Sequence, residues 1–437
     1  MLLNSGLHLR LKIAKDYFFF LRSQKWSRQR LELYQDHMLR KLIRHAGRHV
    51  PYYRKLFEEI EVDIDGFRGC QDMHRIPPLD KETVRTQPNS FIADNAIKFK
   101  PIIAKTSGST GTPLKLMLSA DCRAADASAT LRSYQWAGYY PGKRVFTVKG
   151  FMSQDWEFQY NMLGTSLNFD SVRLSRETAI RVLREIREFK PHIYHGYPFS
   201  LMMLSKIAHD EMIEIPKGQS IIVAGETLSD NCRSVLETVY GGEVFDQYGM
   251  TENTAMITEC EFGNKHLIED FAYHEILNEK GDVLETGGQG EIVGTGYYNY
   301  AMPLIRYKTR DMATIGTNRY ICECGRRFKL VKKIEGRKED YIETPDGRLV
   351  NLIEGAISLG AGIVMSQYVQ DSPDHMYVNI VPGTDFDPNS LWGVERGLRE
   401  RVGRAIKINF EIVSELEKTK GGKIPFILSK IGNKVPA

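Results

Sequence analysis

The chain contains, immediately before Leu114 and Lys115, the run Thr106-Ser107-Gly108-Ser109-Thr110-Gly111-Thr112-Pro113. Glycine lets the backbone approach a ligand and turn its N–H groups inward, while Ser and Thr hydroxyls add donors that suit phosphate oxygens. No Gly-x-x-x-x-Gly-Lys-Ser/Thr frame fits the run, so nucleotide binding of the P-loop type is not supported. The run predicts a phosphate-binding loop, with a flexible Ser/Gly linker as the alternative.

Length and composition indicate a well-packed protein with more than one domain. The chain has 437 residues, of which 42% are hydrophobic and 26% are charged, enough for a large domain and a small one. A net charge of +4 on 59 basic and 55 acidic residues is too small to indicate nucleic-acid binding. Six cysteines without a regular spacing, and no recognisable cleavable leader, predict a reducing compartment, so we expect a cytoplasmic protein.

The first residues are basic and contain one apolar cluster, Tyr17–Leu21, which is followed by Arg22. The cluster is far shorter than the roughly 20 apolar residues that a membrane-spanning helix requires. The leucines and basic residues before it fit a helix that lies on a membrane surface. We favour instead a helix that packs on its own domain.

Strand-like and helix-like runs alternate in the middle of the chain. Apolar residues first recur at helical spacing from Arg28 to Phe57, until Pro51 stops the pattern, and predict one long amphipathic helix there. The runs that alternate after it are Val145–Val148, Thr178–Phe189, His192–His195, Phe199–His209 and Ser220–Val223. This alternation predicts an α/β fold with layered helices and strands.

The pattern changes after Gly336. Short strands at Tyr377–Val381 and Lys407–Ile412 flank a helix-like run at Asn389–Val402. These elements predict a separate small α+β domain of about 100 residues.

The phosphate-binding loop resembles that of the adenylate-forming superfamily of acyl-CoA ligases, adenylation domains and luciferases, and further family landmarks follow in the expected order. Ala224-Gly225-Glu226 follows an apolar strand, and Phe245–Glu252 resembles the family's adenine-binding segment. Besides the loop and Lys115, the resemblance implies nucleotide contacts from Gly225, Glu226, Asp246, Gln247, Tyr248, Gly249, Thr251, Asp311 and Arg337.

The adenine-binding segment carries groups with distinct chemical roles. A tyrosine offers a flat face to adenine, a threonine hydroxyl reaches the α-phosphate, and a glutamate holds Mg²⁺ between phosphate oxygens. By resemblance, Tyr248, Thr251 and Glu252 take these roles, the last two as catalytic residues.

Two further stretches resemble family landmarks. Pro303–Asp311 resembles the stretch whose aspartate accepts both ribose hydroxyls, although Arg310 stands where glycine is usual, which puts the shape of this loop in question. Glu335–Asp340 resembles the hinge between the two domains, with Arg337 near the nucleotide and Glu339 at the pivot. Taken alone, this charged stretch is typical of a solvated turn.

The segment Lys418–Lys423 resembles the family segment whose lysine enters the site during adenylation. An ammonium between the carboxylate and the α-phosphate offsets the negative charge that builds as two anions approach. We assign this role to Lys423, with Lys420 as the rival. The segment alone also fits a plain basic tail.

Within the superfamily, the chain is most similar to the branch of phenylacetate-CoA ligases and capsule-biosynthesis proteins. The stretch Leu39–Arg54 resembles the N-terminal signature of this branch, and the resemblance extends to about Ile431. His195-Gly196-Tyr197 follows a strand where the branch builds the wall of its acyl pocket. A structural role in the core is the alternative for His195.

Three cysteines and one histidine form a candidate metal site, with Cys-x₅-His spacing followed by Cys-x-Cys: Cys260, His266, Cys322 and Cys324. Three thiolates and an imidazole suit a closed tetrahedral structural Zn²⁺ site. Members of this branch carry a similar set. Buried free thiols are the alternative.

The resemblance implies an N-terminal AMP-binding domain of residues 1–337 and a C-terminal lid domain of residues 338–437. It implies that ATP and Mg²⁺ activate a carboxylic acid as its acyl-AMP, and that the lid then rotates before acyl transfer. We expect CoA as the acceptor. The alternatives are an amine of an amino acid or sugar in surface-polysaccharide assembly, and a nucleotide-binding protein that has lost catalysis.

Overall fold

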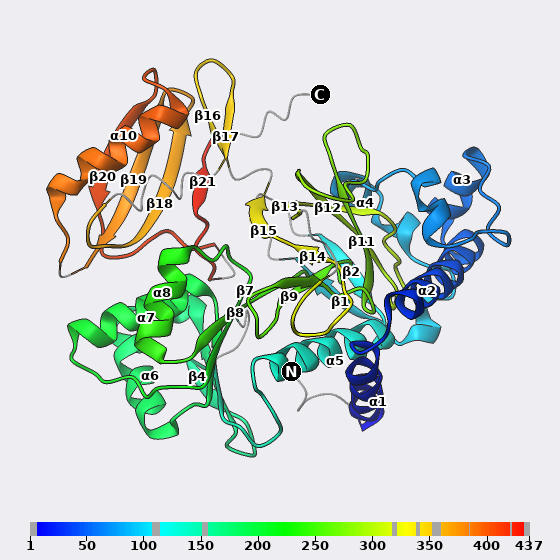
Figure 1. The fold of residues 1–437 in the computed structure, drawn as a ribbon, viewed down its shortest axis with the longest axis horizontal. Helices are drawn as coiled ribbons and strands as arrows, with labels where there is room; N and C mark the ends of the chain where they lie inside the picture. Colours follow the sequence, from blue (N-terminus) through cyan, green and yellow to red (C-terminus); the bar gives the residue numbers. More distant parts are fainter. Residues whose placement is uncertain are drawn as a thin grey trace. The chain divides into compact units, whose positions relative to one another are not determined.

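The computed structural model describes residues 7–106, 114–150, 156–316, 321–337, 341–351, 360–383, 385–419 and 422–431, except for a few side chains at the edges of these ranges (Figure 1). The chain forms two compact units. Unit 1 comprises residues 1–140 and 245–334, and unit 2 comprises residues 141–244 and 335–437. The boundary between residues 337 and 338 stays a prediction.

Unit 1 begins with helices, and the predicted stop at Pro51 divides the stretch from Arg28 to Phe57 into two of them. Helix α2 (Arg28–His49) ends before Val50, which has extended backbone angles, and α3 (Pro51–Glu59) begins at the proline. Proline disfavours helical angles in the preceding residue but fits the first position of a helix. Pro51 therefore ends one helix and starts the next. The other helical elements before residue 137 are α1 (Leu7–Ser23), η1 (Cys70–Arg75), α4 (Lys81–Thr86), η2 (Pro88–Phe91), η3 (Ala96–Phe99) and α5 (Ala120–Trp136).

Helix α1 packs on α5 within unit 1, as expected from the sequence. The Ser128 hydroxyl donates a hydrogen bond to the carbonyl of Ile13 at 2.9 Å. The guanidinium of Arg132 is fully buried, donates to the carbonyl of Phe20 and pairs with Asp270. Among the described residues, no helix is both long and apolar enough to span a membrane.

The strands of unit 1 form antiparallel ladders. One contains β8 (Glu243–Gly249), β9 (Met256–Glu259), β10 (Lys265–Leu267) and β14 (Leu330–Val331), in this order. A second contains β11 (Ala272–Leu277), β12 (Gln289–Gly296) and β13 (Tyr307–Thr314). The short strands β1 (Ile102–Lys105) and β2 (Lys115–Leu118) pair with each other. The chain leaves the unit through β15 (Lys333–Arg337).

The first part of unit 2 has the predicted α/β layering. Its strands lie in the order β7-β6-β3-β5-β4, with β4 antiparallel and the others parallel. From β5 onward, a helix follows each of these strands along the chain, and the apolar faces of the helices form one buried cluster with the strands. The elements are β3 (Val145–Lys149), β4 (Phe158–Tyr160), β5 (Ser166–Asp170), η4 (Ser171–Arg173), α6 (Arg176–Phe189), β6 (Ile193–Gly196), α7 (Pro198–Asp210), β7 (Ser220–Ala224) and α8 (Asp230–Tyr240).

The C-terminal part of unit 2 is the predicted α+β arrangement. A sheet in the order β20-β19-β18-β21 is covered on one face by α10, whose buried side chains include Val394, Leu398 and Val402 (Figure 1). A hairpin of two strands precedes it. The elements are β16 (Tyr341–Glu343), β17 (Leu349–Asn351), β18 (Ile363–Ser372), β19 (His375–Pro382), η5 (Pro388–Ser390), α10 (Leu391–Val402), β20 (Lys407–Ile412) and β21 (Ile427–Ser429).

Candidate functional site

The predicted phosphate-binding loop connects β1 to β2. The Thr106 hydroxyl accepts the backbone N–H of Leu114 at 3.0 Å, and the Thr106 N–H donates to the Leu114 carbonyl at 3.0 Å. The two ends of the loop therefore lie side by side, and Lys115 follows on β2 as an exposed residue. The predicted site residues that lie outside the described residues are Ser107, Gly108, Ser109, Thr110, Gly111, Thr112, Glu339, Lys420 and the side chain of Arg337.

Two of the predicted nucleotide residues meet in unit 1. Tyr248 lies at the end of β8, and its hydroxyl donates a 2.6 Å hydrogen bond to Asp311 Oδ2 on β13. Burial, together with the neighbouring Asp311 carboxylate, raises the pKa of Tyr248 well above its usual value. The hydroxyl therefore stays protonated at neutral pH and keeps the carboxylate in place.

The backbone at Arg310 explains why glycine would be usual there. Arg310 has a φ of 64°, in the left-handed region that a side chain disfavours. Three residues of β13 oppose one residue of β12 at this point, since Lys308 pairs with Val293 and Met312 with Glu291. The Arg310 N–H donates to Glu291 Oε1 at 3.0 Å. This bulge sets the direction of the residue that follows, Asp311.

Glu252 has a partner that the sequence did not single out. Its carboxylate is buried and accepts a 3.1 Å hydrogen bond from the hydroxyl of Tyr307. Burial and the adjacent carboxylate raise the pKa of Tyr307 above its usual range. Thr251, next to Glu252, is half-buried. The Tyr307 hydroxyl can thus hold Glu252, the predicted Mg²⁺ ligand, in one orientation.

We expect Tyr307→Phe to lower kcat for pyrophosphate release about 10-fold, because a hydrogen bond to a charged group is worth about 1.5–3 kcal/mol. Steady-state kinetics with ATP and Mg²⁺ measures this effect. The matched control is Tyr300→Phe, because the buried Tyr300 hydroxyl has no hydrogen-bond partner among the described residues. Equal losses in the two variants would contradict a role for the Tyr307 hydroxyl.

Lys265 on β10 is a second residue that the sequence analysis missed. Its ammonium lies 2.5 Å from Asp246 Oδ2 and 3.3 Å from Glu259 Oε2. The predicted nucleotide residue Asp246 on β8 is therefore held by a cation from β10, on the far side of β9. In the antiparallel pairing of β8 with β9, Gln247 lies opposite Thr258 and Gly249 lies opposite Met256. This pairing fixes the backbone of the predicted adenine-binding segment.

In unit 2, the three residues predicted to line an acyl pocket end β6 and begin α7. His195 is buried, and burial lowers the pKa of its imidazole well below the usual value, so the ring is neutral. A Cβ on Gly196 would lie 2.4 Å from Val148 Cγ1, which shows how tightly β6 packs on β3. Tyr197 is half-buried at the N-cap of α7.

Lys423 lies beside two other predicted residues of unit 2. Its Nζ is 5.6 Å from the centroid of the Tyr197 ring. Gly225 has a φ of 85°, and a Cβ there would lie 3.2 Å from Lys423 Nζ and 3.1 Å from Tyr197 Cε1. The neighbouring Glu226 accepts the backbone N–H of Ile424 at 2.7 Å. Tyr197, Gly225, Glu226 and Lys423 are therefore brought together, although they come from distant parts of the sequence.

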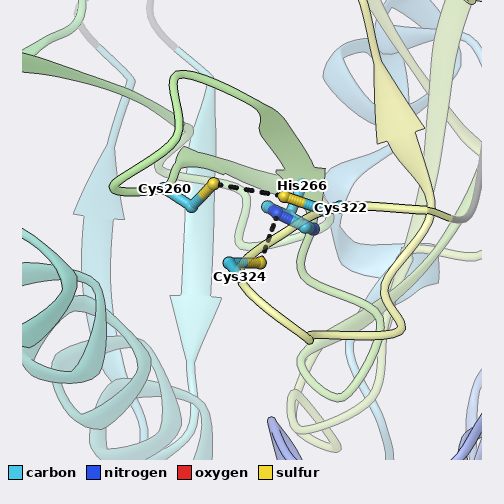
Figure 2. A group of neighbouring side chains, drawn as sticks. All are labelled: Cys260, His266, Cys322 and Cys324. Atoms are coloured by element: carbon cyan, nitrogen blue, oxygen red, sulfur yellow. Dashed lines mark hydrogen bonds between the residues drawn. The ribbon is translucent and has the colours of Figure 1, made fainter.

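The four candidate metal ligands of unit 1 converge (Figure 2). Their ligand atoms all lie within 4.8 Å of one another; Cys324 Sγ lies 3.4 Å from His266 Nε2, and Cys260 Sγ lies 3.6 Å from Cys322 Sγ. Hydrogen bonds from the Cys260 thiol and from His266 lower the pKa of Cys324 despite its burial. This donor set fits a soft or borderline cation such as Zn²⁺.

Two family matches cover most of the described chain. Residues 102–302 match the AMP-binding enzyme family. Residues 342–430 match the CapK C-terminal domain. The chain belongs to the adenylate-forming superfamily. Within this superfamily it falls in the branch that contains phenylacetate-CoA ligases and CapK.

Three relatives place this adenylate-forming chain more closely. It is 23% identical to the protein CapK of Staphylococcus aureus, over 82% of this chain and 81% of that protein. It is 26% identical to a phenylacetate-coenzyme A ligase of Thermus thermophilus, over 72% of each chain. It is 28% identical to the corresponding ligase of Aromatoleum evansii, over 73% of each chain.

The fold of this adenylate-forming enzyme is that of a solved ligase. It is similar to 2-hydroxyisobutyryl-CoA ligase in the postadenylation state, with a TM-score of 0.77 and 18% identity over 94% of this chain and 92% of that chain. At this identity the likeness concerns the fold alone. It confirms the predicted fold class, a large α/β part and a small C-terminal α+β part.

Proposed function

We propose that the chain is an ATP-dependent ligase that activates a carboxylic acid as its acyl-AMP and then transfers the acyl group to CoA. The observation that carries the proposal is the convergence of predicted nucleotide residues within unit 1, above all the 2.6 Å hydrogen bond from Tyr248 to Asp311. The family match over residues 102–302 supports it.

The first half-reaction joins a carboxylate oxygen to the α-phosphorus of ATP, and pyrophosphate leaves with the electron pair of the broken P–O bond. Two anions approach each other in this step, so cationic and hydrogen-bonding groups accelerate it. We assign the ammonium of Lys423 and the hydroxyl of Thr251 to the α-phosphate. Glu252 would hold Mg²⁺, which offsets phosphate charge when bound.

The second half-reaction joins the acceptor to the acyl carbon and releases AMP. CoA is the preferred acceptor because two of the described relatives are named phenylacetate-coenzyme A ligases and the solved structure is named a CoA ligase. An amine of an amino acid or sugar is the second candidate. The match of residues 342–430 to the CapK C-terminal domain, and the likeness to CapK over 82% of this chain, favour it.

The remaining assignments are also proposals. Residues 1–337 form the AMP-binding domain and residues 338–437 form the lid, joined at the hinge that carries Arg337. We assign the wall of the acyl pocket to His195, Gly196 and Tyr197, at the end of β6 and the start of α7. The convergent thiols and imidazole support a structural Zn²⁺ in unit 1. We assign the protein to the cytoplasm.

The test is pyrophosphate release from ATP and Mg²⁺ with a panel of carboxylic acids, each measured with CoA, with amines and with neither. Release that depends on the acid and leads to a thioester supports the CoA ligase. Formation of an amide with amines, and no thioester, would establish the second candidate. No pyrophosphate from any acid of a broad panel would overturn the proposal in favour of a nucleotide-binding protein without catalysis.

A further inference from the structure

The carboxylate of Glu226 bridges two backbone segments of unit 2. Oε2 accepts the N–H of Phe199 at 3.1 Å, and Oε1 accepts the N–H of Ile424 at 2.7 Å. Phe199 lies in the first turn of α7, where the N-cap residue Tyr197 supplies no side-chain hydrogen bond. The first N–H groups of a helix need an external acceptor and favour a negative charge. Glu226 supplies both.

The second segment held by Glu226 is the one that carries Lys423. A local turn closes it, because the Thr419 N–H donates to the Lys423 carbonyl at 2.7 Å and the Lys423 N–H donates to the Thr419 hydroxyl at 3.2 Å. The next side chain, Ile424, is buried in the hydrophobic cluster formed by α6, α7 and α8. The backbone around Lys423 is therefore fixed on both sides.

Lys418 anchors the start of the same segment. Its ammonium donates to the carbonyl of Leu174 at 2.5 Å, and burial lowers the pKa of this lysine. The contact of Glu226 with Ile424 is the anchor nearest to Lys423, one residue away. Burial raises the pKa of Glu226 to about 7, so the bond is charge-assisted above that pH. Because Glu226 lies in the loop after β7, the bond ties the C-terminal part of unit 2 to the α/β part.

We propose that Glu226 is a positioning residue that docks the segment around Lys423 for adenylation, rather than a residue that contacts the nucleotide. Both of its carboxylate oxygens already accept backbone N–H groups, from Phe199 and from Ile424, so the side chain is engaged by the two segments that it joins. The inference rests on the proposed function in one respect, the role of Lys423 in forming the acyl-AMP.

The substitution that tests the docking is Glu226→Gln, which keeps the size of the side chain but turns one acceptor into an N–H donor that faces a backbone N–H. We expect kcat for pyrophosphate release to fall about 10- to 100-fold, the range for loss of a charge-assisted bond. We expect the KM for ATP to stay within about threefold, and acyl transfer from supplied acyl-AMP to be retained. A higher KM for ATP with kcat unchanged would overturn the inference.

Amide hydrogen exchange gives a readout that needs no activity. We expect exchange in the segment around Ile424 to be faster in Glu226→Gln than in the unsubstituted protein. The control is Glu417→Gln, because the exposed Glu417 carboxylate lies in the same segment and pairs with Lys430 at 3.0 Å. Unchanged exchange in Glu226→Gln would overturn the docking role. Failure of the unsubstituted protein to release pyrophosphate would instead overturn the proposed function and leave the exchange result standing.

Discussion

Lys423→Ala is expected to reduce acyl-AMP formation by about 10²- to 10⁴-fold, since removal of a charge aimed at a developing anion costs several kcal/mol in the transition state. Transfer of the acyl group from supplied acyl-AMP to the acceptor should change less than about threefold, because that step no longer joins two anions. Pyrophosphate release measures the first half-reaction. Thioester or amide formation from synthetic acyl-AMP measures the second.

Two variants complete this experiment. Lys430→Ala removes an exposed lysine that follows β21 and pairs with Glu417, and it should leave both half-reactions unchanged. Lys420→Ala tests the alternative adenylation lysine in the same two assays. Equal loss of both half-reactions in Lys423→Ala, or the selective loss in Lys420→Ala instead, would show that the assignment of Lys423 is wrong.

Cys322→Ser is expected to remove bound zinc and to lower the free energy of unfolding by roughly 5 kcal/mol or more, because the binding energy of a structural zinc site is also folding energy. The reason is local geometry, since the Cys322 thiol lies 3.6 Å from Cys260 Sγ among the four convergent ligands. Metal analysis of the purified protein and thermal unfolding with and without a chelator measure the two effects.

Cys232→Ser is the matched control for the zinc experiment. Cys232 is also buried, but it lies in unit 2 and outside the four-ligand cluster. It should lose a small part of its packing energy and no metal. Less than about half an equivalent of zinc in the unsubstituted protein, together with unchanged stability after chelation, would refute the zinc site.

The sequence predicted the features that depend on local pattern. Alternating apolar runs between residues 145 and 224 identified the strands and helices there, because each element has its own period. The stop expected at Pro51 coincides with the end of α2, but the sequence did not indicate that the proline also begins a second helix, α3. The family pattern showed that Arg310 was unusual, yet only the structure explains it, through the left-handed backbone of a β-bulge.

The missed residues of the site depend on tertiary contacts. Tyr307 and Lys265 act on Glu252 and Asp246 from other strands, and nothing in their local sequence reports the pairing that brings them there. The contact of Glu226 with Ile424 joins residues 198 positions apart. Such partners follow from the arrangement of strands and segments, which one sequence does not specify.

Two adjacent residues of β10, Lys265 and His266, connect the candidate metal cluster to the predicted adenine-binding segment. Side chains alternate along a strand, so Lys265 reaches Asp246 in the predicted adenine-binding segment while His266 joins the cysteine cluster on the opposite side. Loss of the zinc proposed for this cluster would loosen β10 and, through Lys265, the position of Asp246, so we expect a chelator to weaken ATP binding as well as stability.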